Sequence, residues 1–180
     1  LATDRNGNTD SAYSFDGSDD YIQTDTVNVP MDEFTYSIWA RPVAHQLGQT
    51  FGTLISRETV PSDNRNLQWL GLGLEGNYLR LHTAPVSQGV NDWIDSTQGH
   101  FTQNQWIHLI GTFDGTAGRI YLDGQLIASG PAPQATASTS YNFRLGADNT
   151  GNPDFLSGQL DDVRIYNRAL SDNEITQLYQ

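Results

Sequence analysis

Residues 119–127 read RIYLDGQLI, and they carry the clearest local structural signal in the chain. Two short hydrophobic runs flank the dipeptide Asp123-Gly124. An Asp-Gly pair readily adopts the positive φ angles that a two-residue β-hairpin turn requires. The segment therefore predicts two antiparallel strands, at Arg119–Leu122 and Gln125–Ser129.

The same kind of pattern continues in both directions along the chain. Short alternating or β-rich runs are separated by clusters of Gly, Asn, Asp and Pro, which is typical of antiparallel β-structure. Nine further strands are predicted, at Ala12–Phe15, Tyr21–Gln23, Phe34–Arg41, Gly52–Ser56, Leu67–Leu74, Tyr78–His82, Trp106–Phe113, Tyr141–Leu145 and Gly158–Tyr166. We therefore expect an all-β fold, a two-sheet antiparallel β-sandwich.

One segment near the C-terminus has the pattern of a helix. Ser171-Asp-Asn-Glu174 matches the capping box, in which the serine side chain caps the helix and the glutamate reaches back. Ile175, Leu178 and Tyr179 follow with the spacing of one apolar helix face. We expect one short C-terminal helix that docks on the sandwich.

The composition limits the classes of protein to consider. The 180 residues suit a single domain, 1–180, and 37% hydrophobic residues are enough for a core. All nine basic residues are arginine, and the net charge of -12 disfavours nucleic acid and anionic membranes as partners. Zero cysteines exclude disulfides and thiolate chemistry. No run approaches the roughly 20 apolar residues of a membrane span, and we expect a domain excised or processed from a larger protein.

Four stretches, in this order, carry a resemblance to a known family. They are Ala12–Tyr21 (AYSFDGSDDY), Phe34–Pro42 (FTYSIWARP), Trp106–Gly115 (WIHLIGTFDG) with Tyr121–Gly124 (YLDG), and Gly158–Ile175 (GQLDDVRIYNRALSDNEI). Together they resemble the laminin G-like, concanavalin A-like jelly-roll family. The resemblance implies a jelly-roll sandwich with one concave face, used mostly to bind glycans or proteins. It also implies that Trp39, Trp106 and His108 belong to the core, and in many members a structural calcium ion lies near the paired chain ends.

The motif SFDGSDDY places Asp16, Asp19 and Asp20 within five positions. If the first and last strands pair, as the resemblance implies, these carboxylates come close to Asp161 and Asp162. Hard oxygen ligands on glycine-rich loops favour calcium over zinc or copper. The alternative is a solvated turn in which the aspartates only cap backbone groups.

Within this calcium hypothesis the five carboxylates are not equivalent. The strongest ligand candidates are Asp16, Asp20 and Asp161. Asp162 has the alternative of pairing with Arg164 or Arg168. A second acidic loop, Asp148–Asp154, lacks EF-hand spacing and is either a second calcium site, through Asp148 and Asp154, or an Asx-rich turn.

Strand alternation also predicts a ligand-binding face. Because successive side chains of a strand point to opposite sides, Trp69 faces away from the leucines of its strand, and Tyr78, Arg80 and His82 do the same on the next strand. Aromatic rings stack on sugars, and Arg and His bind hydroxyls or a carboxylate. Trp93, in a polar segment expected to be a loop, joins the candidates. The alternative is a second small core under a loop.

We therefore predict a non-catalytic, calcium-stabilised carbohydrate-binding module of a polysaccharide-degrading enzyme or surface adhesin. It is expected to be secreted or at the cell surface, monomeric when isolated, and to bind an anionic or densely hydroxylated glycan. The second hypothesis is an adhesion or structural domain that binds a protein partner or acts as a spacer. A hydrolase or lyase is the third, disfavoured because the four glutamates are isolated and the paired carboxylates of a glycosidase are not evident.

Overall fold

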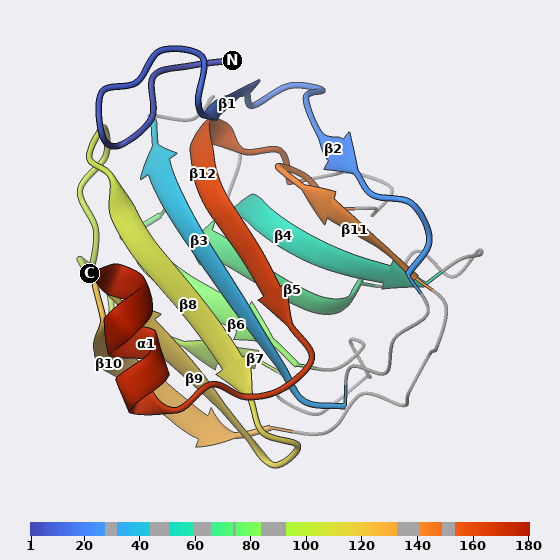
Figure 1. The fold of residues 1–180 in the computed structure, drawn as a ribbon. Coiled ribbons are helices and arrows are strands. Elements are labelled where there is room, and N and C mark those ends of the chain that lie inside the picture. Colours follow the sequence, from blue (N-terminus) through green and yellow to red (C-terminus); the bar gives the residue numbers. More distant parts are fainter. Residues whose placement is uncertain are drawn as a thin grey trace.

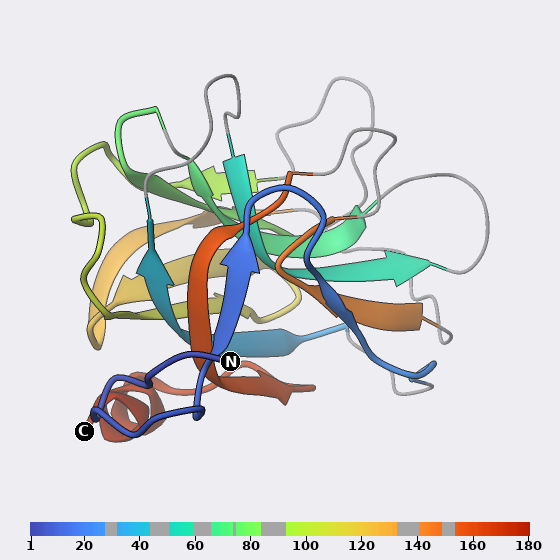
Figure 2. The ribbon, with the colours of Figure 1, turned by 90° about the horizontal axis from the view of Figure 1, so that it is seen from above.

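A computed structural model describes residues 1–27, 32–43, 51–59, 66–73, 75–83, 93–132, 141–148 and 154–180. In these segments the strands form two antiparallel six-stranded sheets, and one helix follows them (Figure 1). The two sheets lie face to face as the layers of a sandwich (Figure 2). The predicted all-β sandwich with a short C-terminal helix, consistent with a jelly roll, is confirmed.

The first sheet has the order β1 (Tyr13–Asp16), β12 (Ser157–Tyr166), β3 (Phe34–Pro42), β8 (Ile107–Phe113), β9 (Ala117–Leu122) and β10 (Gln125–Pro131). The second has the order β2 (Ile22–Gln23), β11 (Tyr141–Leu145), β4 (Phe51–Thr59), β5 (Asn66–Gly73), β6 (Tyr78–His82) and β7 (Trp93–Asp95). Helix α1 spans Asp172–Tyr179.

Each of the eleven predicted strands overlaps an observed strand, and β7 is the strand that sequence reasoning missed. Trp93 was expected in a loop without a strand partner. It instead lies in β7, directly opposite His82 of β6. The prediction failed there because three residues in a polar context are too few for an alternating pattern to stand out.

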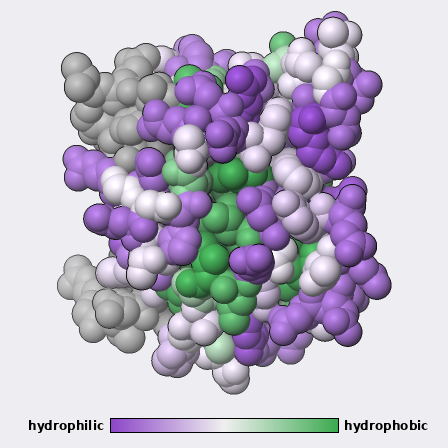
Figure 3. Space-filling view, turned by 90° about the vertical axis from the view of Figure 1, so that its left-hand side faces the viewer, coloured by the Kyte–Doolittle hydropathy of each residue, from purple (hydrophilic) through white to green (hydrophobic). Residues whose placement is uncertain are grey.

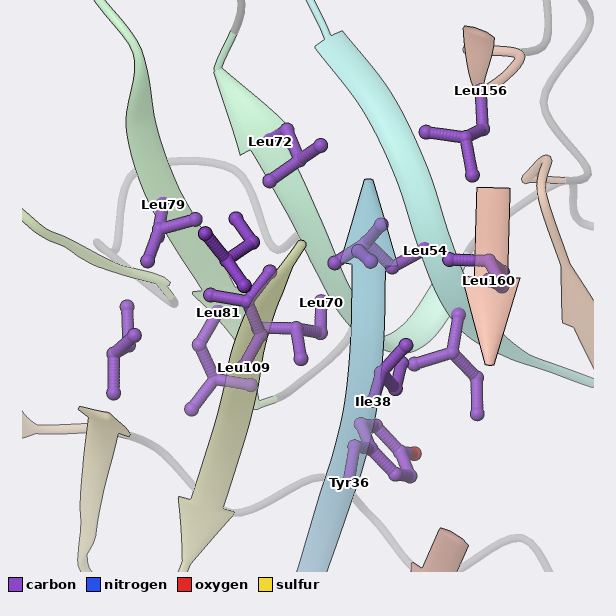
Figure 4. Close-up of a cluster of buried hydrophobic side chains, with 14 of the residues drawn as sticks. Tyr36, Ile38, Leu54, Leu70, Leu72, Leu79, Leu81, Leu109, Leu156 and Leu160 are labelled. Carbon is purple, nitrogen blue, oxygen red and sulfur yellow. The ribbon is translucent and has the colours of Figure 1, made fainter. Parts of the chain in front are cut away.

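The core lies between the sheets, where side chains from both layers point toward one another (Figure 4). The second sheet contributes Leu54, Leu70, Leu72, Leu79 and Leu81, and the first contributes Tyr36, Ile38, Leu109 and Leu160. Burial of each such side chain stabilises the fold by about 1.5–3 kcal/mol. The alternation that buries these leucines turns the intervening residues of β5 and β6 outward.

The hairpin between β9 and β10 has the predicted turn. Asp123 and Gly124 have φ angles of 50° and 77°, the left-handed conformation that an Asp-Gly turn supplies. The Asp123 side chain adds a tertiary contact, because its Oδ1 accepts a hydrogen bond of 2.9 Å from the backbone N–H of His108. The turn therefore also ties β9 and β10 to β8.

Helix α1 covers part of the outer face of the first sheet (Figures 1 and 2). Its predicted capping box is present, with Ser171 and Glu174 bonding each other's backbone groups. Ile175 is fully buried and packs with Ile110 of β8 and Tyr121 of β9. No helix in the described part of the chain is long and apolar enough to span a bilayer.

The outer face of the first sheet also corrects one prediction about the core. Trp39, Trp106 and His108 were expected in the core, but both tryptophans are only half-buried, and of the three only His108 is buried. Trp39 and His108 stack with ring centroids 4.9 Å apart, and Tyr179 of α1 stacks on both rings. His108 is 1% exposed, and it packs with the helix residue Tyr179.

Strand β10 forms one edge of the first sheet. On this side of the molecule hydrophobic residues gather in a strip across the middle of the surface, with hydrophilic residues around it (Figure 3). Leu126 of β10 is 52% exposed, while Ile127 and Ala128 pack against the core. Edge strand β10 therefore has apolar side chains both against the core and exposed to solvent.

Candidate functional site

The outer face of the second sheet carries a row of side chains that crosses four strands. Ser56 of β4 lies opposite Trp69 of β5, Trp69 opposite His82 of β6, and His82 opposite Trp93 of β7. Directly opposed residues of antiparallel strands place their side chains on the same face of a sheet. The row explains how residues far apart in sequence come to lie side by side.

Arg80 and Tyr78 extend this face along β6, two and four positions from His82. Phe51 at the start of β4 completes it, with its ring 5.6 Å from that of Trp69 and 6.1 Å from that of Tyr78, both edge-on. We define the aromatic face as Phe51, Trp69, Tyr78, Arg80, His82 and Trp93. The structure thus brings together all five ligand-binding candidates predicted from the sequence.

Arg80 lies at the centre of the aromatic face. Its Nε and Nη2 atoms donate two hydrogen bonds of 2.6 Å each to the two carboxylate oxygens of Asp95. Its guanidinium carbon lies 4.8 Å from the ring centroid of Phe51 and 4.9 Å from that of Trp93. A bidentate ion pair together with stacking fixes the plane of the guanidinium group.

Two glycines allow the aromatic rings to lie against the sheet. A Cβ atom at Gly71 would overlap the ring of Trp69, and a Cβ atom at Gly73 would overlap the ring of Tyr78. Both rings therefore rest on backbone that has no side chain in the way. Close approach of a ring to the backbone is a reason for glycine inside a strand.

The residues of the aromatic face differ in exposure. Trp69 is 5% exposed, and its Nε1 donates a hydrogen bond of 2.6 Å to Thr53 Oγ1. Trp69 thus agrees with the predicted alternative of a small core, and it forms the floor of the face. Tyr78, Arg80 and Trp93 are half-buried and keep part of their surface open to solvent.

His82 lies between the two tryptophans, with ring centroids 5.3 Å from Trp69 and 5.6 Å from Trp93. Burial is the main cause that lowers the pKa of His82 to about 4, and the positive charge of Arg80 adds to it. At neutral pH the imidazole is therefore uncharged. It takes part in the face as a flat ring and a neutral hydrogen-bonding group.

Sequence reasoning missed Phe51, Thr53 and Asp95 as members or supports of this face. Asp95 stands two positions after Trp93, so an assignment of β7 as a strand would have placed both on one face. Phe51 and Thr53 lie at the start of β4, where a register shift between Thr53 and Ile55 interrupts simple alternation. Such a bulge has no evident signature in one sequence.

The first acidic cluster lies at the end of β1. One oxygen from each of Asp16, Asp19 and Asp20 lies within 4.8 Å of the others. Asp16 Oδ1 also accepts a hydrogen bond of 2.8 Å from the backbone N–H of Ser18, across a turn in which Gly17 has a φ of 80°. The donor set suits a hard cation, and the same geometry suits a capped turn.

The other two predicted ligands of this cluster lie elsewhere. β1 and β12 do pair, but Asp16 is opposite Ser157, so Asp161 lies at the far end of the pairing. Arg5 forms ion pairs of 3.0 Å with Asp161 and 2.5 Å with Asp162. The expectation that five carboxylates share one edge is therefore corrected, because register separates the two groups.

The predicted alternative for Asp162 has a counterpart in the structure. Arg164 Nη2 lies 3.7 Å from Asp162 Oδ2, a longer contact than that of Arg5. Arg168, the other suggested partner, instead forms an ion pair of 2.6 Å with Glu174. Among the described residues Asp162 therefore belongs to an arginine–carboxylate cluster at the β12 bulge.

The second acidic pair adjoins the aromatic face. The backbone N–H of Asp154 donates a hydrogen bond of 3.1 Å to Asp148 Oδ1, and Asp148 is 4% exposed. Burial and the charge of Asp148 raise the pKa of Asp154 to about 6. Thr53, whose Oγ1 accepts a hydrogen bond from Trp69 Nε1, also donates its backbone N–H to the Asp154 carbonyl at 3.1 Å. A chain of contacts thus links this pair to the floor of the face.

The family model of the concanavalin A-like lectin/glucanases superfamily, a laminin G-type model, matches residues 16–176. The protein belongs to this family. It is a laminin G-like, lectin-like domain, as the four sequence stretches predicted.

One curated relative and two solved structures illustrate the range of similar proteins. The adhesion G-protein coupled receptor V1 of Danio rerio is 24% identical over 163 residues, which are 86% of this chain and 2% of the receptor. A heptameric pentraxin of Limulus polyphemus has a TM-score of 0.74 and 17% identity, with 93% of this chain and 80% of the pentraxin covered. Domain 4 of the extracellular arabinanase AbnA of Geobacillus stearothermophilus, in complex with arabinotriose, has a TM-score of 0.68 and 25% identity, covering 94% of this chain and 76% of that one.

Proposed function

We propose that the domain is a non-catalytic carbohydrate-binding module of a secreted or cell-surface protein. The observation that carries this proposal is the aromatic face, where Tyr78 and Trp93 flank Arg80 and keep part of their surface exposed. Flat rings stack on the apolar faces of sugars, while a fixed ion pair offers donors and acceptors for hydroxyl groups. The arabinotriose complex of the arabinanase domain supports the same class of ligand.

The exposed residues of the aromatic face are proposed to contact the glycan. Tyr78 and Trp93 each lie within 6 Å of the Arg80 guanidinium carbon, at 5.7 and 4.9 Å from ring centroid to carbon. A ligand that spans Arg80 can therefore reach both rings. Trp69 and His82 hold these residues in place from below, and we expect them to act through positioning.

A glycan array probed with the folded domain tests this proposal. The wild-type protein is expected to bind a defined glycan, and Trp93→Ala to weaken that binding about tenfold or more, which corresponds to about 1.4 kcal/mol. Tyr13→Ala is the matched control, because Tyr13 is an exposed aromatic residue on the first sheet. Unchanged affinity in Trp93→Ala and Tyr78→Ala would contradict the placement of the site.

The non-catalytic assignment rests on the positions of the carboxylates. Glu174 lies on α1 outside the first sheet, and Glu75 lies in the turn before β6 of the second. The close pair Asp148 and Asp154 is joined by a backbone hydrogen bond, whereas glycosidase carboxylates flank a cleft about 5–9.5 Å apart. Release of reducing ends from a polysaccharide panel would contradict this assignment.

We also propose that Asp16, Asp19 and Asp20 bind calcium. Within the described residues none of the three forms an ion pair with a basic side chain, so a cation would relieve their mutual repulsion. Their carboxylate oxygens match the ligands that calcium prefers. Asp148 and Asp154 are a second proposed cation site, with the Asx turn as the alternative use of the same atoms. Asp161 is no longer part of the proposed set.

Thermal unfolding in calcium and in EDTA tests the first metal site. A ligand at 100 times its Kd stabilises the folded state by about 2.7 kcal/mol, so calcium should raise the Tm of the wild-type domain. The double variant Asp16→Asn/Asp20→Asn should lose the part of this shift that the first site contributes, whereas Asp10→Asn, a nearby exposed control, should keep the whole shift. Equal Tm values in calcium and EDTA would contradict the calcium site and favour the alternative of a capped turn.

An adhesion role through a protein partner remains the second candidate function, and the similarity to an adhesion receptor favours it. It predicts capture of a specific extracellular protein by the domain without signal on the glycan array. The variant Trp93→Ala distinguishes the two roles. It removes a ring from the face proposed to bind sugar, so it should weaken glycan binding in particular.

A further inference from the structure

The charge on Arg80 is already balanced within the protein. Both oxygens of Asp95 accept hydrogen bonds from its guanidinium fork at 2.6 Å, and the two residues are directly opposite in the register of β6 and β7. An anionic ligand group that approached this edge of the guanidinium would have to displace Asp95. The carboxylate is attached to the next strand, so displacement would break a preorganised pair.

The rings around Arg80 hold the guanidinium in this orientation. Phe51 and Trp93 contact it at 4.8 and 4.9 Å, and Tyr78 at 5.7 Å. Each of these contacts constrains the plane of the group, which limits rotation toward a second carboxylate. The pair therefore offers the ligand a fixed neutral unit with both donor and acceptor atoms.

The other charged groups described beside the aromatic face do not make it positive. Arg144 is engaged by the Tyr21 ring at 4.4 Å, by Gln23 and by the backbone carbonyl of Asp148. The side chains of Asp148 and Asp154 bring negative charge to the same end. The described part of this region thus holds two arginines, Arg80 and Arg144, and four carboxylates, Asp95, Asp148, Asp154 and Glu75, in a chain of net charge -12.

A hydroxyl group and a carboxylate meet this arrangement differently. A hydroxyl can donate to Asp95 and accept from Arg80, whereas a carboxylate or sulfate can only accept. The anion is also repelled by Asp95 and by the field of an acidic protein. A like charge placed against an incorrect ligand is an established route to specificity.

From these contacts we propose that the aromatic face selects neutral, polyhydroxylated glycans and that the Arg80–Asp95 pair excludes glycans that carry carboxylate or sulfate. The inference deepens the proposed function of carbohydrate binding and rests on it. It narrows the ligand expected from the sequence, which was either anionic or densely hydroxylated, to the second class.

The test compares neutral and acidic glycans and includes esters that separate the effect of charge from that of size. The folded domain is titrated with neutral oligosaccharides, with the same oligosaccharides capped by sialic acid or bearing sulfate, and with the methyl esters of the sialylated forms. The neutral glycans are expected to bind, the acids to bind at least tenfold more weakly, and the methyl esters to recover most of the lost affinity. Esters match the acids closely in shape, so recovery separates charge from size.

The variant Asp95→Asn tests the role assigned to the pair. It removes one negative charge and one strong acceptor from Arg80 while it keeps the shape of the side chain. Relative affinity for the sialylated glycan over its neutral parent should increase at least tenfold. Asp10→Asn removes the same charge from an exposed position near the N-terminus, and it should leave the ratio unchanged.

Each outcome separates this inference from the proposed function. Binding of acids as tightly as neutral glycans, or more tightly, would overturn the selection for neutral ligands and leave carbohydrate binding standing. If the folded wild-type protein binds none of the glycans, both the selection for neutral ligands and the proposed carbohydrate binding are overturned. If Asp95→Asn does not fold, the comparison of acids with their methyl esters on the wild type still decides the matter.

Discussion

The outer faces of the two sheets use the same pair of residue types in different ways. On the first sheet Trp39 stacks with His108 at 4.9 Å, and on the second Trp69 contacts His82 at 5.3 Å. The first pair packs against Tyr179 of α1, and Arg5 lies 4.7 Å from the Trp39 ring. Beside the second pair, Tyr78, Arg80 and Trp93 keep solvent-exposed surface.

The two Trp–His pairs differ in their neighbours: Tyr179 of α1 stacks on the first pair, whereas Phe51 and Trp93 adjoin the second. Burial lowers the pKa of both histidines to about 4, so neither is chosen for its charge. A helix that docks on one face makes its aromatic residues part of the scaffold. On the face proposed to bind sugar, the outermost residues remain accessible, so the same residue types would be available to a ligand.

The largest expected effect comes from loosening the helix on the first face. Ile175 is fully buried against Ile110 and Tyr121, and truncation of a buried isoleucine to alanine costs about 2–5 kcal/mol. Ile175→Ala should therefore lower the free energy of unfolding by this amount in urea denaturation. Glycan affinity, measured where the variant is folded, should stay at the wild-type value.

Acid should destabilise the first face through His108. Its pKa is about 4 when folded and about 6.5 when unfolded, mainly because the side chain is buried and also because Arg164 and Arg5 are near. The unfolded chain therefore binds the proton first, and stability is fully present above pH 6.5 and falls as the pH decreases toward 4. The difference between the folded and unfolded pKa values of His108 corresponds to about 3 kcal/mol of folding free energy that is lost at low pH.

Urea unfolding between pH 7.5 and pH 4.5 measures this loss, and His108→Gln isolates it because glutamine does not titrate. The wild type should lose more stability than the variant over this range. His82 and Asp154 titrate in both proteins, and the raised pKa of Asp154 acts in the opposite direction, so both contributions cancel in the difference. Parallel profiles would contradict the buried, neutral assignment of His108.

A smaller effect on stability is expected on the second face. A methyl group at Gly71 would overlap the Trp69 ring, and overpacking of this kind costs about 1–3 kcal/mol. Gly71→Ala should lift Trp69 from the sheet and weaken glycan binding through the residues above it. Gly130→Ala is the matched control, because its Cβ would meet Ile94 Cγ1 at an ordinary 3.7 Å and should change neither stability nor affinity appreciably.

Local signals in the sequence were enough to predict much of the fold. The Asp123-Gly124 hairpin and the Ser171–Glu174 capping box depend on neighbouring residues only, and both formed as expected. The grouping of Trp69, Tyr78, Arg80 and His82 on one face followed from alternation in two adjacent strands. These features need no knowledge of distant contacts.

The features that were missed depend on distant segments. Whether Asp161 joins Asp16 is set by the register of β1 against β12 and by Arg5, which lies far away in sequence. The burial of Trp69 to 5% exposure depends on what packs around it, which alternation cannot show. Alternation predicts the face of the sheet to which a side chain points. How deeply that side chain is buried depends on the tertiary structure.

The pairing of β1 with β12 also has a mechanical consequence. Tyr13 is opposite Leu160 and Asp16 opposite Ser157, so the N-terminal end of β1 and the onward path of β12 leave the pairing at the same end. A tensile force applied to the two ends of the domain would therefore break these hydrogen bonds one after another, starting at that end, rather than all at once. Arg5, which bridges to Asp161 and Asp162 at that end, would resist this opening, and single-molecule pulling on Arg5→Ala should record a lower unfolding force.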